Sequence, residues 1–496
     1  MQIKTISKYV IGAVCGALIT VSIHSYADST SDASSSSTSV NIPVDEINNF
    51  AKVYAITKNY YVESVADTKL MKGAIDGMLT NLDPHSNYLD QTGFKQLTEM
   101  TNGSFAGLGI EVSRDKDDGG IKVVAPIDGT PAFTAGIKSG DIIIKIDDVP
   151  VTGLSLDEAV KKMRGKAGTK VTVTISRKNE LKPLNFTITR ANIKITSIKY
   201  TMLDHDYGYI RITNFQADTI DELVNALNTL YTKDPKIKGL VLDLRDDPGG
   251  LLQAAVGVVG AFVPANSLVV STKGRAPNST QQFYVRPADY SIDDKVSNTL
   301  AKIPPIYKTL PLVVMVNQGT ASASEIVSGA LQDYKRAKII GTKTFGKGSV
   351  QTVIPLSADT AVKLTTALYY TPKGRSIQAE GIKPDIIVKS EYNDLFDSWD
   401  MSEASLDNHL DNPNGVSVSK DKDNTPVITP PKQISTTAEL KAKYKAQMLN
   451  VPSVVKQSQA TVDLKTDFQL QWALNIIEGK PIPAATTKTP MKQSLK

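Results

Sequence analysis

The stretch LVVMVNQGTASASE, residues 312–325, decides which fold this chain adopts. Its first five residues are apolar and mostly β-branched, which is typical of a strand buried on both faces. A short polar loop follows, and Ser322 with Glu325 forms the capping box that begins a helix. The stretch therefore predicts strand, loop and helix in succession, the repeating unit of a buried, largely parallel sheet.

Two other stretches repeat this pattern. GLVLDLRDDPGG (239–250) is an apolar strand that runs into a glycine turn, and KIIGTKTFGKGSVQ (338–351) is a strand that runs into a loop with a lysine. Parallel strands point the same way, so the loops after all three strands gather at one carboxyl edge of the sheet, where ligands bind. We therefore expect Ser322 and Lys347, 25 residues apart in sequence, to be neighbours in space.

The third loop nearly matches a phosphate-binding motif, but two observations argue against that reading. Gly341 is followed by four residues and then Gly346-Lys347, yet a glycine stands where the motif needs a hydroxyl. A phosphate-binding loop must also enter a helix. Residues 349–354 and 363–370 alternate instead and are rich in β-branched or aromatic side chains, which predicts strands.

A lysine beside a serine at such an edge indicates nucleophilic catalysis. Serine needs a base to remove its proton, and all four histidines lie outside the three loops. Lysine can replace histidine if its pKa, ordinarily near 10.4, falls to about 7 through burial. Phe345 and Val350 are apolar residues that would surround Lys347 in this way. No metal-ligand spacing occurs, so we expect neither a metal nor another cofactor.

The position of Ser322 is consistent with two roles. Most serines in a capping box only begin the helix. A nucleophile also fits there, because the Ala323 N–H at the positive end of the helix would stabilise a tetrahedral oxyanion. The turn with Gly249 and Gly250 exposes backbone amides that would supply a second donor. Ser324 is the alternative nucleophile, although a helix turns it roughly 200° away from Ser322.

A separate unit precedes this sheet. Residues 107–112, 121–124 and 170–176 have the pattern of strands, the last closing the unit, and residues 155–163 form a helix with a capping box. The stretch AGIKSGD (135–141) and the isoleucine-rich strand after it resemble a PDZ domain.

The PDZ resemblance implies a binding mode. Such domains add a peptide as an extra strand and hold its free carboxylate on backbone N–H groups. By this resemblance, the carboxylate loop is Gly107, Leu108, Gly109 and Ile110. A tightly turning strand start is the alternative interpretation of the same glycines.

The N-terminus predicts export. Lys4 and Lys8 precede an apolar run at 9–23, and small residues suited to a signal peptidase follow at 25–27. The run is shorter than the about 20 residues of a membrane span, but an uncleaved anchor is the alternative. The only cysteine, Cys15, lies inside it, so no disulfide can form. We expect an exported, periplasmic protein that contacts a membrane only if this segment is retained.

The composition is that of a soluble protein with several domains. Of the 496 residues, 41% are hydrophobic and 22% charged, and the net charge of +5 is too small to predict nucleic-acid binding. We predict a multidomain α/β and α+β fold. Its segments are a signal peptide (1–27), a Ser-rich linker (28–42), a helical region (43–102), a PDZ domain (103–190), an α/β core with a largely parallel sheet (191–390), a linker (391–435) and a helical extension (436–496) with helices at 438–448 and 468–477.

Taken together, the motifs resemble the carboxy-terminal processing, or tail-specific, proteases over roughly residues 45–390. The matching stretches are NQGTASASE (317–325), TFGKGSVQ (344–351), LDLRDDPGG (242–250) and LDPHS (82–86). The resemblance implies a serine endopeptidase with a serine–lysine dyad. Ser322 would be the nucleophile, Lys347 the base and Gln351 an assisting polar residue on the same face of an extended strand, with an ordinary strand glutamine as the alternative.

The family also implies the substrates and partners. These are exported or membrane-associated proteins with accessible apolar C-termini, captured by the PDZ domain and then cleaved. Arg164 would link tail binding to assembly of the site, with a solvated arginine as the alternative. A homodimer is expected, and a non-catalytic PDZ scaffold with an inactive core is the alternative function.

One feature departs from the family pattern. Asp246 and Asp247 stand where the family commonly has asparagines. Two extra negative charges near Lys347 would raise its pKa and with it the pH optimum.

Overall fold

The structure is a computed structural model, and part of the chain lies outside its description. It describes residues 43–114, 120–203, 206–292, 296–390, 402–415, 425–428, 462, 464 and 466–482. The expected signal peptide (1–27), the Ser-rich linker (28–42), most of the linker at 391–435 and the helix expected at 438–448 lie outside the described residues. None of the helices in the described ranges is long and apolar enough to span a membrane.

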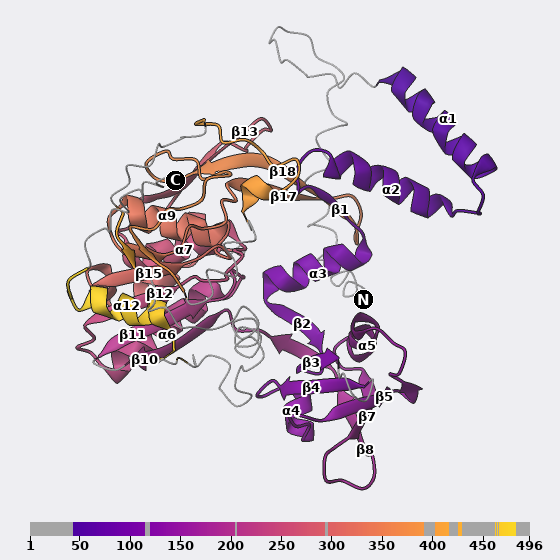
Figure 1. Cartoon of the computed structure of the whole chain (residues 1–496), viewed down its shortest axis with the longest axis horizontal. Coiled ribbons are helices and arrows are strands. Elements are labelled where there is room, and N and C mark those ends of the chain that lie inside the picture. The colour runs from indigo at the N-terminus through magenta and orange to yellow at the C-terminus, as the bar shows by residue number, and fades with distance from the viewer. Residues whose placement is uncertain are drawn as a thin grey trace, which may run out of the picture. The chain divides into compact units, whose positions relative to one another are not determined.

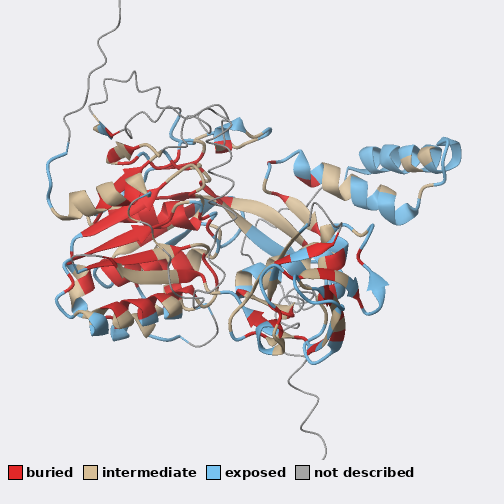
Figure 2. Ribbon diagram, turned by 60° about the horizontal axis from the view of Figure 1, so that its bottom comes forward, coloured by how far each residue is buried: buried red, intermediate tan, exposed pale blue. Residues whose placement is uncertain are grey.

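The chain divides into two compact units, residues 1–71 and 72–496. The first contains α1 (Val44–Tyr60), none of whose residues is buried. Helix α2 (Asp67–Thr80) crosses the division, and α3 (Gln91–Asn102) belongs to the second unit. Figure 2 shows the contrast between the exposed α1 and the buried strands of the second unit.

A seven-stranded sheet forms the centre of the second unit. In spatial order its strands are β10 (Ile198–Leu203), β11 (Tyr207–Ile212), β12 (Gly239–Asp243), β15 (Leu312–Val316), β16 (Lys338–Gly341), β19 (Ile386–Val388) and β20 (Val427–Ile428). Every neighbouring pair is parallel except β10 with β11. The predicted α/β fold with a largely parallel sheet is therefore confirmed.

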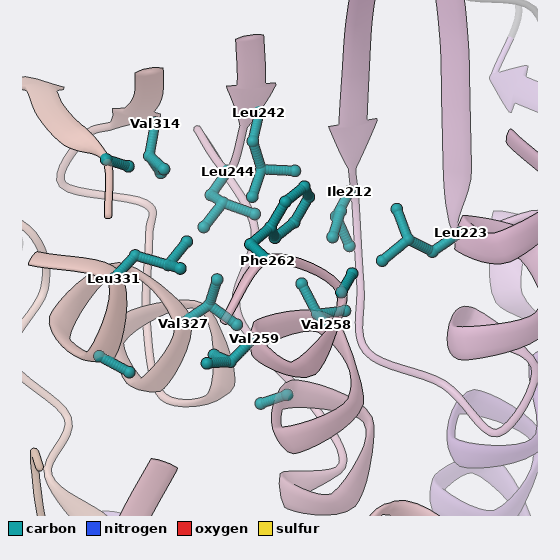
Figure 3. Close-up of a cluster of buried hydrophobic side chains, with 14 of the residues drawn as sticks. Ile212, Leu223, Leu242, Leu244, Val258, Val259, Phe262, Val314, Val327 and Leu331 are labelled. Atoms are coloured by element: carbon teal, nitrogen blue, oxygen red, sulfur yellow. The ribbon is translucent and has the colours of Figure 1, made fainter. Parts of the chain in front are cut away.

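Helices cover both faces of this sheet (Figure 1). Strand residues such as Leu242 and Val314 pack against α6 (Thr219–Lys233), α7 (Leu252–Phe262) and α9 (Ala323–Asp333). Figure 3 shows the side chains of this core meeting between the strands and the helices. Because side chains alternate along a strand, residues such as Val313 face the other way. They pack against α12 (Phe468–Ile477), the second helix expected in the C-terminal extension.

A second sheet lies beside the third loop. Its strands are β1 (Asn87–Leu89), β13 (Leu268–Gly274), β14 (Gln281–Tyr284), β17 (Ser349–Pro355) and β18 (Ala361–Tyr370). Strands β17 and β18 are the two that the sequence predicts after Lys347, and they form an antiparallel pair. The third loop thus enters a strand and not a helix. Shorter helical turns are α8 (Pro287–Tyr290) and the 3₁₀ turns Thr299–Lys302, Pro305–Lys308 and Glu403–Ser405.

The PDZ-like unit has its own sheet and core. Its strands are β3 (Ile110–Arg114), β4 (Ile121–Pro126), β5 (Ile142–Ile146), β7 (Lys170–Ser176) and β8 (Leu184–Thr189), in that order, with β6 (Val149–Pro150) paired to β5. Its helices are α4 (Pro131–Ala135) and α5 (Leu156–Met163), and α5 has the predicted Ser155–Glu158 capping box. Strand β8 was not predicted, so β7 does not close the sheet. Strands β2 (Ser104–Gly107) and β9 (Ala191–Lys194) pair where the chain enters and leaves this unit.

The core between the central sheet and α9 can be tested with Leu331. This side chain of α9 is 0% exposed, so Leu331→Ala leaves a cavity and should lower the free energy of unfolding by about 3 kcal/mol. Leu356→Ala removes the same atoms from a side chain that is 60% exposed and should change it by less than about 0.5 kcal/mol. Urea unfolding followed by circular dichroism measures both, and equal losses would contradict the packing described here.

Candidate active site

The three loops after β12, β15 and β16 are joined by backbone hydrogen bonds. The N–H of Ala321 donates to the Asp247 carbonyl oxygen at 3.0 Å, which ties the second loop to the first. The N–H of Phe345 donates to the Thr320 carbonyl oxygen at 3.0 Å, which ties the third loop to the second. The predicted meeting of the three loops at one edge is confirmed.

Ser322 has a strained backbone at the start of α9. Its φ of +55° and ψ of −114° form a combination that non-glycine residues rarely adopt. Such strain is concentrated at functional sites, where the surrounding structure has to hold it. The side chain is half-buried, whereas the alternative Ser324 is fully buried and its hydroxyl donates to the Asp247 carbonyl at 3.0 Å. Ser322 is therefore the more accessible of the two hydroxyls.

The carboxylate of Glu325 joins Ser322 to Lys347. Its Oε2 accepts the backbone N–H of Ser322 and that of Lys347, each at 2.9 Å. Its Oε1 accepts the Gly346 N–H at 2.8 Å and the Thr344 hydroxyl at 2.5 Å. Burial raises the pKa of Glu325 to about 7, although these hydrogen bonds favour the charged form. The sequence predicted a capping glutamate here but not its contacts with the third loop.

A tyrosine bridges the same two residues from β18. The hydroxyl of Tyr369 lies 3.0 Å from the carbonyl oxygen of Ser322 and 2.6 Å from that of Lys347. The ring is 1% exposed, and burial raises the pKa of the hydroxyl, which therefore stays protonated. The backbones of Ser322 and Lys347 are thus held together on both sides.

Lys347 is prepared to lose its proton. Burial lowers the pKa of its amine to about 8, and the positive charge of Lys363 acts in the same direction. The negative charges of Glu403, Glu325 and Asp83 oppose this effect. A lysine at pH 7 would then be neutral in roughly one molecule in ten, against fewer than one in a thousand for an exposed lysine.

The expected effect of the two aspartates on Lys347 is wrong. The pKa of the amine is lowered, and neither Asp246 nor Asp247 is among the charges with the largest effect on it. Asp246 lies 3.6 Å from Arg211 and accepts a hydrogen bond from Asn317 at 2.8 Å. The position of the two aspartates in a neighbouring loop therefore did not predict a large effect of their charges on the Lys347 amine.

The predicted oxyanion donors lie beside Ser322. A Cβ on Gly249 would lie 2.8 Å from the Ala323 nitrogen and 2.9 Å from the Ser322 Cβ, so only glycine fits. The Ala323 N–H, at the first turn of α9, donates to no group in the described part of the chain. The Gly249 N–H donates to Asp247 Oδ1 at 2.9 Å and would have to leave it to bind substrate. Gly250 follows with a φ of +146°.

Gln351 has partners other than the expected one. Its amide nitrogen donates to the Ser349 hydroxyl at 3.0 Å and to the Thr365 hydroxyl at 3.2 Å. A β-bulge between Val350 and Gln351 interrupts the alternation on which the same-face argument depended. The Thr365 hydroxyl donates in turn to Asp83 at 3.0 Å, so Gln351 connects the site to the LDPHS turn.

Comparison with known proteins identifies the family. The sequence matches peptidase family S41 over residues 206–388, a PDZ domain over 96–176 and the activating protease CtpB N-terminal domain over 9–93. A carboxy-terminal-processing protease of Bartonella bacilliformis is 45% identical over 365 residues, which are 73% of this chain and 80% of that protein. The chain belongs to peptidase family S41.

The comparisons found further similar proteins. A probable CtpA-like serine protease of Staphylococcus aureus is 38% identical over 344 residues, 69% of this chain and 64% of that protein. The solved photosystem II D1 C-terminal processing protease has 30% identity and a TM-score of 0.38, over 68% of this chain and 86% of its own. This S41 protein is thus a serine-type peptidase with a PDZ domain.

Among the described residues, no strand pairs with the outer edge of β3 in the PDZ domain of this S41 peptidase. Strand β3 lies at the end of its sheet. In the loop before it, the Leu108 carbonyl oxygen accepts the Ala132 N–H at 3.0 Å, and the Gly109 carbonyl oxygen accepts the Ile127 N–H at 2.9 Å. No hydrogen bond among the described residues uses the N–H groups of Leu108 and Gly109. Partly buried apolar side chains of β3 and α5 pack against the core of this domain. They are Ile110 and Val112 of β3 and Leu156 and Val160 of α5.

Arg164 is engaged with neighbouring residues. One guanidinium nitrogen lies 2.5 Å from Glu99 of α3, and the guanidinium carbon lies 4.7 Å from the centre of the Phe105 ring. Its side chain is 37% exposed. The arginine therefore connects the end of the PDZ helix to α3 and β2.

The role of Glu325 in this S41 peptidase can be tested with Glu325→Gln. Glutamine keeps one acceptor oxygen but turns its amide toward N–H donors, and each buried N–H left unpaired costs about 1–3 kcal/mol. We expect kcat/KM to fall at least about 100-fold, because Ser322 and Lys347 lose their common support.

Glu222→Gln is the matched control. Glu222 also accepts backbone N–H groups, from Ser197 at 2.8 Å and Ile198 at 3.2 Å, but in α6 and away from the three loops. It should lower thermal stability without changing kcat/KM of the folded enzyme. Equal kinetic losses in the two variants would show that Glu325 acts only on stability.

Proposed function

We propose that this S41 peptidase cleaves peptide bonds with a Ser322–Lys347 dyad. The observation that carries the proposal is the single carboxylate of Glu325, which accepts the backbone N–H of both residues at 2.9 Å. The lowered pKa of the buried Lys347 amine and the strained backbone of Ser322 support it independently.

The chemistry follows from these positions. The neutral amine of Lys347 removes the proton of the Ser322 hydroxyl as its oxygen attacks the scissile carbonyl carbon. The Ala323 N–H, with the Gly249–Gly250 turn, stabilises the resulting oxyanion. The Lys347 ammonium then returns the proton to the leaving amine as the C–N bond breaks, which leaves an acyl-serine. The amine next activates a water molecule, which releases the acid and restores the serine.

We propose that the PDZ domain selects substrates by apolar C-terminal tails. The free edge of β3 can accept an extended peptide as a further strand, and the N–H groups of Leu108 and Gly109 can bind its carboxylate. The side chains of Ile110, Val112 and Val160 beside this edge would contact apolar residues of the tail. Arg164, between this domain and α3, would transmit tail binding.

Two further parts of the proposal concern assembly and location. Helix α1 exposes apolar side chains that a second copy of the chain would cover, which supports a homodimer. These are Val44, Ile47, Phe50, Val53 and Ile56, each at least 46% exposed. Export to the periplasm, and membrane contact if the apolar run at 9–23 is retained, rest on the sequence of that run.

The dyad predicts the effect of three substitutions and of pH. Ser322→Ala and Lys347→Ala should lower kcat/KM for a polypeptide with an apolar tail at least about 1000-fold, because nucleophile or base is lost. Lys347→Arg should be as inactive, since guanidinium does not deprotonate.

In the wild type, kcat/KM should rise as pH increases and level off above about 8, because the neutral amine is the active form.

Lys343→Ala is the control, because Lys343 is an exposed lysine of the same loop and should be dispensable. Full turnover by either alanine variant of the dyad would remove that residue from the mechanism. Tail binding without cleavage by the wild type would favour the alternative of a non-catalytic PDZ scaffold.

Tail recognition can be measured as binding to the Ser322→Ala protein, which does not consume its ligand. A peptide with an apolar free C-terminus should bind at least about tenfold more tightly than the same peptide amidated, because the amide lacks the charged acceptor. Val160→Asp in α5 should weaken binding, and Lys161→Asp, on the exposed side of the same helix, should not. Indifference to both amidation and Val160→Asp would exclude this groove.

A further inference from the structure

Residues 402–415 lie beyond the part of the chain that matches the S41 family, yet they contact the third loop. The sequence assigned them to a linker because they are polar and without periodicity. In the structure Glu403 is 1% exposed, and its N–H donates to the Phe345 carbonyl oxygen at 3.0 Å. Phe345 precedes Lys347 by two positions. A buried glutamate in such a segment calls for an explanation, because burying a carboxylate without partners is costly.

One side chain connects Glu403 to the residue after Lys347. Gln378 is fully buried, and its Oε1 accepts the Gly348 N–H at 2.9 Å. Its Nε2 donates to Glu403 Oε1 at 3.0 Å and to the Leu410 carbonyl oxygen at 3.1 Å. The loop with Lys347 is thus attached to residues 402–415 on both sides of the lysine, at Phe345 and at Gly348.

Glu403 also contacts the LDPHS turn near the start of the second unit. Nε2 of His85 lies 2.8 Å from Glu403 Oε2 and 3.0 Å from Oε1. The same turn holds Asp83, whose Oδ1 accepts the N–H of His85 at 2.8 Å and the Thr365 hydroxyl at 3.0 Å. Glu403 therefore joins three segments that are far apart in the sequence.

Besides attaching the loop, Glu403 acts through its charge on the pKa of Lys347. Positive Lys363 of β18 favours the neutral amine, whereas Glu403, Glu325 of α9 and Asp83 of the turn favour the charged amine. Among these acidic groups Glu403 has the largest effect on the pKa of Lys347. Glu403 and Glu325 also add to the effect of burial in raising the pKa of Tyr369.

We propose that Glu403 is a positioning residue of the dyad, an inference that rests on the proposed function. It holds the loop that carries Lys347 against His85 and Gln378. Its negative charge also reduces the share of Lys347 amine that is neutral at a given pH, so it determines where the activity rises with pH.

The test is the pH dependence of kcat/KM for the wild type, Glu403→Gln and Asp407→Asn. Glutamine keeps one acceptor oxygen and removes the charge, so the rise in activity should move to lower pH. We expect a move of about one unit, the low end of the pKa shifts that a nearby opposite charge causes. Asp407 is exposed and four residues away, so Asp407→Asn removes the same charge and should leave the profile unchanged. A uniform loss at every pH in Glu403→Gln, with the rise in place, would overturn the role of the charge.

Glu403→Asp separates charge from position. It keeps the negative charge on a shorter side chain, so the rise should stay within about 0.3 pH units of the wild type while the plateau falls. A rise that moves as far in Glu403→Asp as in Glu403→Gln would overturn the role of the charge, and this variant also serves if Glu403→Gln does not fold.

A second measurement does not depend on turnover. An acylating reagent modifies only the neutral form of an amine, so its rate of reaction with Lys347 measures the fraction of neutral Lys347. The experiment uses the Ser322→Ala protein, and the same protein with Lys347→Arg gives the background reaction of the other lysines. Adding Glu403→Gln should shift this rate profile to lower pH by the same amount, and an unshifted profile would overturn the inference. A failure of the proposed dyad would be seen in a different experiment, as turnover that persists in the Lys347→Ala variant.

Discussion

The active site depends on one buried carboxylate that accepts hydrogen bonds from two loops. A parallel sheet brings the loops after β15 and β16 to the same edge, but an edge alone fixes neither their separation nor their orientation. Glu325 fixes both, because its two oxygens accept four donors from the start of α9 and from residues 344–347. Those hydrogen bonds offset part of the desolvation of the carboxylate, so the same contacts that place Ser322 and Lys347 also favour the charged form of Glu325.

The residues that surround Lys347 come from distant parts of the chain. Tyr369 and Lys363 belong to β18, Asp83 and His85 to a turn that precedes the PDZ domain, and Glu403 to a segment that follows the residues matched to the S41 family. Burial and the charge of Lys363 lower the pKa of Lys347, and three carboxylates limit that fall. The basicity of the amine is therefore a balance among distant segments, which makes it sensitive to how those segments pack.

Local sequence predicted the elements, and the topology of parallel sheets predicted the meeting of the loops. The apolar runs of β12, β15 and β16, the alternation of β17 and β18 and the capping box of α5 are signals within ten or fewer residues. Strand β8 and the bulge before Gln351 were missed although each lies in a local hairpin, β7 with β8 and β17 with β18. The burial of Glu403 was missed because it depends on His85, a partner far away in the sequence. Asp246 and Asp247 were misjudged for a different reason: Asp246 lies 3.6 Å from Arg211, and burial raises the pKa of Asp247 to about 7, so neither charge is among the largest effects on Lys347.

The central claim is that the Lys347 amine is held in a site that favours its neutral form. Nuclear magnetic resonance of the wild-type protein labelled at its lysine side chains measures this directly, with Lys347→Arg to assign the signal. The structure predicts that the Lys347 signal titrates with a midpoint near 8. A midpoint at or above the ordinary lysine value of 10.5 would contradict the account, because an amine that stays charged cannot accept the serine proton.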